Sequence, residues 1–245
     1  MSRPRVALIT GAATGIGRAI SWRLASLGFA VVVNYSKSRQ DAEETIDGIQ
    51  VRGGQALLAQ ANVADDSAVR QMVEQASAKF GNLDLVVNNA ATTHFVDHQD
   101  LDGLTERVWD EILDVNLKGT FYVCRASMPI LKASRGNIVN IASVAGVAGS
   151  GSSIAYAASK GGVITMTKSL AKAFAPEVRV NAVAPGPVQT RWLADHQDMV
   201  EKAIKVTPLE RVATPDDIAD VVLFLANETS LMTGQVLVVD GGRTI

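Results

Sequence analysis

Short apolar runs alternate with longer amphipathic segments along almost the whole chain. The apolar runs, which have the length of strands buried on both faces, are residues 6–10, 30–35, 56–61, 83–88, 136–142, 178–184 and 235–239. Segments of helical character separate them, and strands that alternate with helices indicate parallel βαβ units. The pattern predicts an α/β fold in which helices cover both faces of a doubly wound, mainly parallel sheet of seven strands.

Two polar stretches interrupt this alternation. Residues 92–105 are expected to form a polar loop, and residues 191–209 a loop with room for a short helix. Ligands of doubly wound sheets bind beyond the carboxyl ends of the strands, where such loops lie. We therefore expect these two segments to shape a substrate pocket. No repeat, linker or low-complexity segment divides the sequence, so one domain over residues 1–245 is expected.

Composition narrows the range of partners. The chain has 245 residues, is 47% hydrophobic and carries a formal net charge of -2 without a long run of one sign. Nucleic acid and membranes are therefore not expected as partners. Cys124 is the only cysteine, which excludes an internal disulfide and a cysteine-based metal site. The apolar run near the N-terminus is too short for a signal peptide, so we expect a cytoplasmic protein.

A glycine-rich turn joins the first apolar run to a predicted helix. Gly11, Gly15 and Gly17 have a GxxxGxG spacing rather than the more common GxGxxG. Glycines at such a point leave the backbone N–H groups of the helix start open to an anion. The turn therefore indicates a phosphate site, and its place between a strand and a helix strengthens that interpretation.

Tyr156 and Lys160 lie four residues apart in a predicted helix, so their side chains share one face. A tyrosine has a pKa of about 10, and roughly 4 kcal/mol of phenolate stabilisation would bring that pKa near neutrality. A cation a few ångströms away supplies an energy of about this size. The pair is therefore a candidate acid–base site. A partly buried tyrosine beside a snorkelling lysine is the alternative.

Several short motifs occur together in a fixed order. They are TGAATGIG at 10–17, NNAA at 88–91, Asn116, Ser143, Tyr156 with Lys160, PGPVQT at 185–190 and GQVLVVDGG at 234–242. Through this combination, which spans nearly the whole chain, the sequence resembles the short-chain dehydrogenase/reductase family in its compact single-domain branch. The similarity is greatest to the group that contains 3-oxoacyl-acyl-carrier-protein reductases and sugar or polyol dehydrogenases.

The resemblance implies hydride transfer between a nicotinamide cofactor and a small-molecule carbonyl or secondary alcohol. Tyr156 would exchange a proton with the substrate oxygen, Ser143 would hold that oxygen, and Lys160 would lower the pKa of Tyr156 and bind the nicotinamide ribose. Asn116 would anchor a water that relays protons through Lys160; an asparagine that only bonds its local backbone is the alternative. For the whole chain, the alternatives are an NAD(H)-dependent sugar, polyol or other alcohol dehydrogenase and a nucleotide-binding relative without turnover.

The resemblance also implies a cofactor site built from the glycine turn and from residues that follow later strands. Its members are Gly11, Thr14, Gly15, Ile16, Gly17, Tyr35, Ser36, Lys37, Asn62, Val63, Asn89, Ala90, Tyr156, Lys160, Pro185, Gly186, Val188 and Thr190. Asn62 stands where the family often has Asp and would contact the adenine. Asn89 and Ala90 would line the ribose side, whereas Val188 and Thr190 would orient the carboxamide.

The segment after the second apolar run favours NADP(H) over NAD(H). Tyr35 occupies the position where NAD-dependent relatives carry an aspartate for the ribose hydroxyls. Residues 36–39 follow, and they offer hydroxyl donors and two cations to a 2′-phosphate. Lys37 is the first choice for the phosphate ligand and Arg39 the second; a solvated helix start is the alternative. Residues 11–15 contain no basic residue, which weakens the preference.

A homotetramer, or at least a dimer, is expected. In the second half of the predicted helix 107–132, positive charges recur only every seven residues, at Lys118, Arg125 and Lys132, so they form one narrow stripe. The remaining surface is apolar or small over a wider arc than one sheet face covers. Small residues within 155–162 would allow helices to approach closely, and the resemblance points to helices that pair across two-fold axes.

Histidines and tryptophans give the remaining candidates. His94 and His98 are four residues apart but lie in a predicted loop, and hydride transfer needs no metal, so no metal site is expected. Trp192 follows the PGPVQT motif directly and is a candidate for a mobile lid over the substrate. Trp22 and Trp109 are expected in the core.

Overall fold

A single parallel sheet runs through the molecule. The computed structural model describes residues 3–245, and its seven strands are ordered β3-β2-β1-β4-β5-β6-β7. The strands are β1 (Val6–Ile9), β2 (Ala30–Tyr35), β3 (Ala56–Gln60), β4 (Leu85–Asn88), β5 (Asn137–Ile141), β6 (Arg179–Pro185) and β7 (Val236–Val239). All six strand pairings are parallel. The predicted seven-stranded, doubly wound α/β fold is confirmed.

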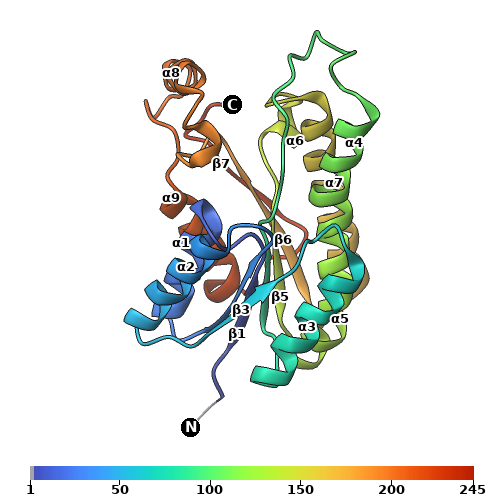
Figure 1. The fold of residues 1–245 in the computed structure, drawn as a ribbon, viewed down its shortest axis with the longest axis vertical. Coiled ribbons are helices and arrows are strands. Elements are labelled where there is room, and N and C mark those ends of the chain that lie inside the picture. Colours follow the sequence, from blue (N-terminus) through green and yellow to red (C-terminus); the bar gives the residue numbers. More distant parts are fainter. Residues whose placement is uncertain (1–2) are drawn as a thin grey trace.

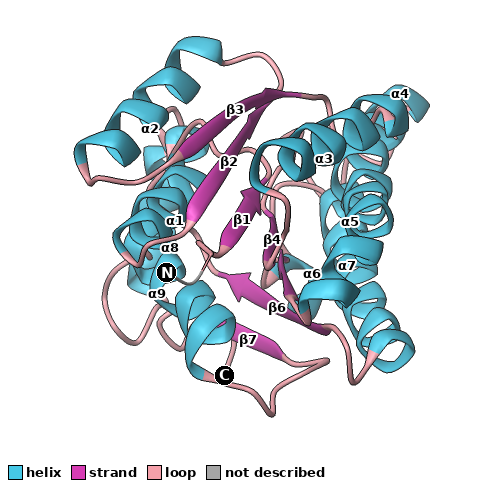
Figure 2. Ribbon diagram, turned by 90° about the horizontal axis from the view of Figure 1, so that it is seen from below, coloured by secondary structure: helices cyan, strands magenta, loops and turns pink. Residues whose placement is uncertain are grey.

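Helices cover both faces of the sheet (Figures 1 and 2). On one face lie α1 (Gly15–Ser26), α2 (Arg39–Val51) and α9 (Pro215–Leu223); on the other lie α3 (Asp66–Phe80), α4 (Glu106–Leu113), α5 (Thr120–Ser134) and α7 (Ile154–Phe174). Two short helices, α6 (Ala145–Ala148) and α8 (Gln197–Lys205), lie beyond the carboxyl ends of the strands. No helix within residues 3–245 is both long and apolar enough to cross a bilayer.

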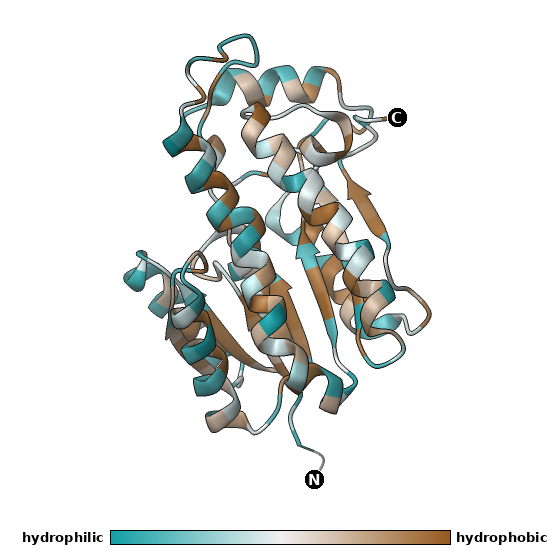
Figure 3. Ribbon diagram, turned by 90° about the vertical axis from the view of Figure 1, so that its right-hand side faces the viewer, coloured by the Kyte–Doolittle hydropathy of each residue, from teal (hydrophilic) through white to brown (hydrophobic). Residues whose placement is uncertain are grey.

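The strands are apolar on both faces because helices bury both. Side chains on one face of β1 (Ala7, Ile9) pack with α1 and α9, and those on the other (Val6, Leu8) pack with α3 and α5. This is why the strands lack an alternating polar pattern. Figure 3 shows the result: the strands are mostly hydrophobic with a few hydrophilic positions, whereas the helices carry hydrophilic residues on part of their surface.

Helix starts follow the local chemistry of the sequence. Thr214 accepts a hydrogen bond from the backbone of Asp217, the Asp217 carboxylate accepts one from the Thr214 backbone, and Pro215 fills the first position of α9. This is a capping box with proline where its missing N–H costs nothing. Asp65 likewise caps α3 through the backbone N–H groups of Ser67 and Ala68. Such caps place each helix relative to the loop that precedes it.

The predicted continuous helix 107–132 is interrupted. A π-helical turn, η1 (Asp114–Gly119), separates α4 from α5. The turn packs closely, since a Cβ on Gly119 would overlap the side chain and backbone of Val63. Tertiary contacts thus override the helical periodicity there, and π turns of this kind occur often at functional sites.

Candidate active site

One large cavity lies beyond the carboxyl ends of the strands. Its volume is about 780 Å³, and loops that follow β1, β2, β3, β4, β5 and β6 all contribute to its wall. Every residue predicted for the site lines this cavity except Gly17 and Asn116. Residues spread from Gly11 to Thr190 therefore converge at the edge where ligands of doubly wound sheets bind.

The glycine turn forms one wall and is held rigidly. A Cβ on Gly17 would overlap the carbonyl oxygen of Gly11, and a Cβ on Gly11 would lie 2.9 Å from the Cα of Ala90. Asn89 donates hydrogen bonds from Nδ2 to the carbonyl oxygens of Thr10 and Gly11, both at 3.0 Å. Gly17 thus shapes the turn from behind the cavity wall. Its role and that of Gly11 follow from the close backbone approach that only glycine permits.

Asn34 is a supporting residue that sequence reasoning missed. Its Oδ1 accepts a hydrogen bond from the backbone N–H of Gly11, and its Nδ2 donates to the carbonyl oxygens of Ala59 and Ala61. The side chain is 1% exposed. An asparagine within the otherwise apolar run AVVVNY was the available signal, because a buried amide must find partners. Asn34 ties the glycine turn to the ends of β2 and β3.

The end of β2 provides the polar part of the same wall. Ser36, Lys37 and Ser38 line the cavity, and Tyr35 is 3% exposed beneath them. Arg39, in contrast, donates from Nε to the Glu43 carboxylate at 2.8 Å and does not line the cavity. The structure therefore keeps Lys37 as a candidate phosphate ligand and places the second choice, Arg39, away from the cavity.

Helix α7 carries the acid–base pair in the wall of the cavity. Ser153 caps this helix by accepting a hydrogen bond from the backbone N–H of Tyr156 at 3.2 Å. One turn further, Lys160 places its Nζ 5.7 Å from the centroid of the Tyr156 ring. The same Nζ donates to the carbonyl oxygen of Ile141 at 2.8 Å, and the lysine is 3% exposed. Lys160 is therefore a buried cation and does not snorkel to the surface.

Burial governs the protonation of this pair. It raises the pKa of Tyr156 to about 12, and the neighbouring Ser143 hydroxyl lowers that pKa by a smaller amount. Burial also lowers the pKa of Lys160 to about 8. Desolvation of the phenolate is the largest influence on the pKa of Tyr156, and the expectation that Lys160 draws this pKa toward neutrality stays a prediction. Tyr156 is consequently protonated at neutral pH and able to donate a proton.

Asn116 lies in the π turn η1, behind the acid–base pair. Its Oδ1 accepts from the backbone N–H of Thr92 at 2.8 Å, and its Nδ2 donates to the carbonyl oxygen of Thr92 and to Ser159 Oγ, both at 3.0 Å. Ser159 in turn donates to the carbonyl oxygen of Tyr156. These partners are remote in sequence, so the alternative of an asparagine bonded only to its local backbone is wrong. Asn116 couples the loop after β4 to the helix of the acid–base pair.

Aromatic side chains form the opposite, more exposed wall. Trp192, in the short 3-10 helix η2 (Arg191–Leu193), meets the Tyr156 ring edge-on with centroids 6.3 Å apart. Phe95 stacks on His196 with centroids 4.0 Å apart. Both Phe95 and Trp192 are about two-fifths exposed, at 41% and 43%. Trp192 therefore has the position that a lid requires, whereas its motion stays a prediction.

The two other histidines show no shared site. His94 pairs through Nε2 with the Glu111 carboxylate at 3.0 Å. Within residues 3–245, no group of three His, Cys, Asp or Glu side chains could hold a metal ion. Cys124 is buried and accepts a hydrogen bond from Asn88 Nδ2, and burial raises the pKa of its thiol to about 12. A thiol of this kind is a packing group and not a nucleophile.

Comparison with known proteins identifies the family. A family model described as enoyl-(acyl carrier protein) reductase matches residues 11–244. A solved structure from Burkholderia xenovorans, titled as a short-chain dehydrogenase/reductase, superposes with a TM-score of 0.94 at 35% identity, over 99% of each chain. The chain is a short-chain dehydrogenase/reductase. It thus belongs to a family of oxidoreductases, and its resemblance to 3-oxoacyl-acyl-carrier-protein reductases within that family is confirmed.

Curated relatives of this short-chain dehydrogenase/reductase are reductases by name. The chain is 42% identical to ketoacyl reductase 2 of the granaticin polyketide synthase from Streptomyces violaceoruber, over 97% of this chain and 95% of the relative. It is 39% identical to the 3-oxoacyl-acyl-carrier-protein reductase FabG of Staphylococcus aureus, over 99% of both chains. The matched lengths therefore include the glycine turn, the acid–base pair and the aromatic wall.

Proposed function

We propose that the chain catalyses the NADP(H)-dependent reduction of a carbonyl group to a secondary alcohol, with 3-oxoacyl thioesters as the substrate class. The observation that carries this proposal is the half-buried Tyr156, which faces the cavity beside Lys160 and Ser143, together with the glycine turn in the same wall. The substrate class is supported by the names of the relatives, which are ketoacyl and 3-oxoacyl reductases.

The residues of the cavity fit a nicotinamide dinucleotide. A Cβ at Gly11 or Gly17 would collide with neighbouring backbone and displace the turn that lines the cavity, where the start of α1 offers free N–H groups to a diphosphate. Tyr35 leaves the end of β2 without the carboxylate that would repel a 2′-phosphate, and Lys37 offers a cation there. The dinucleotide would lie from Lys37, across Gly15, to the acid–base pair.

The catalytic step that we propose depends on the side chains of the chain itself. The bound nicotinamide supplies the hydride to the carbonyl carbon. Ser143 hydrogen-bonds the carbonyl oxygen, and Tyr156 donates its phenolic proton to that oxygen as negative charge develops there. The Lys160 ammonium stabilises the resulting phenolate at short range in a low-dielectric site. Asn116 holds the loop after β4 and the tyrosine helix in register, and the relay water that it would anchor belongs to the proposal.

A Tyr156→Phe variant tests the reaction. General acid catalysis contributes about 10²- to 10⁴-fold, so kcat for NADPH-dependent reduction of a 3-oxoacyl thioester should fall by at least about 100-fold. Affinity for NADPH should stay within a few-fold, because the phenol adds little to cofactor binding. Retention of more than a tenth of the wild-type kcat would remove Tyr156 from the mechanism.

A panel of substrates and both cofactors separates the alternatives. Turnover of sugars or polyols with NAD, and not of 3-oxoacyl thioesters with NADPH, would favour the alternative dehydrogenase. Quenching of nicotinamide fluorescence without turnover on any carbonyl would favour a binding protein without activity. Lys37→Ala should lower kcat/KM with NADPH by about 10-fold and leave NADH unchanged, as expected for one lost charge-assisted hydrogen bond.

We also propose that the chain assembles as a homotetramer in the cytoplasm. Apolar side chains stay exposed on the outer elements: Phe121 on α5 is 40% exposed, and Val238 on the edge strand β7 is 45% exposed. Edge strands and apolar helix faces of this kind are commonly covered by two-fold contacts. Sedimentation at micromolar concentration should give a tetramer, or at least a dimer; a monomer would contradict the proposal.

A further inference from the structure

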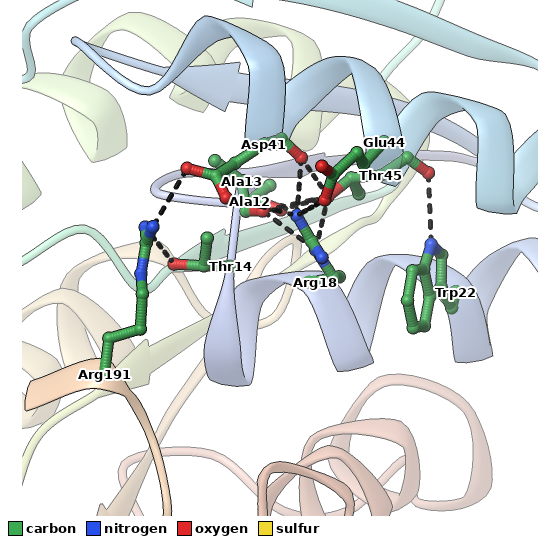
Figure 4. Close-up of polar contacts among 9 residues, drawn as sticks. All are labelled: Ala12, Ala13, Thr14, Arg18, Trp22, Asp41, Glu44, Thr45 and Arg191. Atoms are coloured by element: carbon green, nitrogen blue, oxygen red, sulfur yellow. Dashed lines mark hydrogen bonds and ion pairs between the residues drawn. The ribbon is translucent and has the colours of Figure 1, made fainter. Parts of the chain in front are cut away.

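Arg191 bridges the two walls of the cavity. It is the first residue of η2, directly after Thr190, on the side of the aromatic wall. One guanidinium nitrogen donates to Thr14 Oγ1 at 3.2 Å, and the other donates to Asp41 Oδ2 at 3.0 Å (Figure 4). The residue also lines the cavity. An arginine from the substrate side thus reaches the glycine turn and the first turn of α2.

The contact falls where the glycine turn lacks a basic side chain. Thr14 lies between Gly11 and Gly15 and occupies the N-cap of α1, and its hydroxyl accepts from Arg191. Asp41 lies three residues after Ser38, which lines the cavity at the end of β2. The guanidinium therefore sits between the turn and the start of α2, on the side of the cavity where Lys37 also lies.

Two other arginines near this point, Arg39 and Arg18, are already engaged. Arg39 is paired with Glu43 at 2.8 Å. Arg18 donates to the carbonyl oxygens of Ala13 and Asp41 and pairs with Glu44 at 3.1 Å, so it serves to hold the turn against α2. Figure 4 shows its guanidinium enclosed by these groups, whereas that of Arg191 approaches from the opposite side.

The Arg191–Asp41 pair is suited to exchange partners. Arg18 also lies 3.7 Å from Asp41, so two guanidinium groups share one carboxylate. The Arg191 side chain is 62% exposed, and ion pairs at such exposure contribute little free energy. A phosphate dianion offers a guanidinium a stronger, bidentate partner than this shared carboxylate.

We propose that Arg191 is a specificity-determining residue that binds the 2′-phosphate of NADP(H) from the substrate side of the cavity. It supplies the cation that residues 11–15 lack and exchanges Asp41 for the phosphate. This inference rests on the proposed NADP(H) preference.

Direct binding measurements test the assignment. Dissociation constants for NADPH, NADH and adenosine 2′,5′-bisphosphate are measured by fluorescence and calorimetry in wild type, Arg191→Ala and Arg191→Lys. Arg191→Ala should weaken NADPH and the bisphosphate by about 10- to 100-fold and leave NADH within about 2-fold, as expected for one charge-assisted contact. Arg191→Lys keeps the charge without the planar fork, so its NADPH affinity should lie between those of wild type and Arg191→Ala.

Arg243→Ala is the matched control, because Arg243 also lines the cavity but makes no ion pair within residues 3–245. The control should leave the NADPH-to-NADH ratio unchanged.

Each contrary result has a distinct meaning. Equal losses for NADPH and NADH in Arg191→Ala would place the contact on the diphosphate or the loop and overturn the 2′-phosphate assignment. No loss of affinity for either cofactor would show that Arg191 only pairs with Asp41.

Asp41→Asn removes the competing carboxylate and should raise the affinity for NADPH but not for NADH; an unchanged NADPH affinity would overturn the exchange of partners. A wild type that prefers NADH would overturn the cofactor proposal and this inference together, whereas a preserved NADPH preference in Arg191→Ala would overturn this inference alone.

Discussion

The two walls of the cavity differ in what holds them. One wall, formed by the glycine turn and the end of β2 and called here the cofactor wall, is backbone that two side-chain amides fix in place, since Asn34 and Asn89 are both bonded to Gly11. The aromatic wall is a short surface segment, in which Trp192 is 43% exposed and touches Tyr156 edge-on. A site built on fixed backbone can bind one constant ligand, whereas a wall of exposed side chains can change with little cost in stability.

The largest effect should come from the cofactor wall, through Gly17→Ala. The added Cβ overlaps the Gly11 carbonyl oxygen, a backbone atom that Asn89 holds in place. The turn must shift, so we expect dinucleotide affinity to fall more than tenfold and stability to fall by about 2–3 kcal/mol. Fluorescence titration and chemical denaturation measure the two quantities.

Gly81→Ala provides the control for that substitution. Gly81 ends α3 with φ 76°, and a Cβ there has nothing within 4 Å. Only left-handed backbone strain is added, so stability should fall by about 1 kcal/mol and cofactor affinity should not change. If Gly17→Ala behaved like Gly81→Ala, the tight packing of the glycine turn would not matter for binding.

Lys160→Met measures how much the buried lysine of the acid–base pair destabilises the folded protein. Burial lowers the pKa of Lys160 from 10.5 to about 8, a penalty of about 3 kcal/mol below pH 8, partly offset by the bond to Ile141. The apolar variant should therefore lose activity and gain about 2 kcal/mol of stability at pH 7.

The stability difference between wild type and Lys160→Met should depend on pH in a definite direction. Between pH 8 and 10.5 the unfolded wild type binds the lysine proton and the folded one does not, so wild-type stability rises with pH. The advantage of Lys160→Met should shrink across that window. Tyr156, whose folded pKa is about 12, acts oppositely but only above pH 10. A variant that is less stable than wild type at every pH would contradict a buried charge at this position.

The cofactor wall could be predicted from the sequence to a greater extent than the aromatic wall, for a physical reason. Strands buried on both faces and glycines at a strand–helix junction leave patterns of composition and spacing, so the sheet, the turn and the pairing of Tyr156 with Lys160 were all predictable. The pKa values of Tyr156 and Lys160 were not predictable, because they depend on burial by distant segments such as η2, whose Trp192 meets the Tyr156 ring. Asn34 left a visible but unused signal as an amide within an apolar run.

Local sequence patterns could not predict the aromatic wall or the contact of Arg191 with Asp41. Phe95 and His196 are about a hundred positions apart, and their stacking depends on loop shape. Arg191 reaches Asp41 across 150 positions, so neither residue shows its partner in the sequence. The π turn at Asn116 is likewise set by remote contacts to Thr92 and Ser159. Contacts of this kind follow from the fold and not from periodicity.

The smallest effect should come from the aromatic wall, and a pair of tryptophans isolates it. Trp192→Ala removes the ring that faces Tyr156. Loss of one partly exposed aromatic contact should raise KM for the carbonyl substrate by about 5- to 10-fold, with NADPH affinity unchanged and stability within about 0.5 kcal/mol of wild type. Trp22→Ala is the matched substitution on the other side of the molecule. Trp22 donates from Nε1 to the carbonyl oxygen of Thr45 at 3.1 Å and packs α1 against α2.

The two variants should therefore differ in which property changes, KM for Trp192→Ala and stability for Trp22→Ala. Trp22→Ala should lower stability by about 2 kcal/mol, less than the loss for a fully buried tryptophan, and leave KM for the substrate near its wild-type value. Steady-state kinetics with saturating NADPH and thermal denaturation of both variants make the comparison. A drop in stability for Trp192→Ala as large as that for Trp22→Ala would show that the aromatic wall is part of the fixed core, and the contrast between the two walls would then fail.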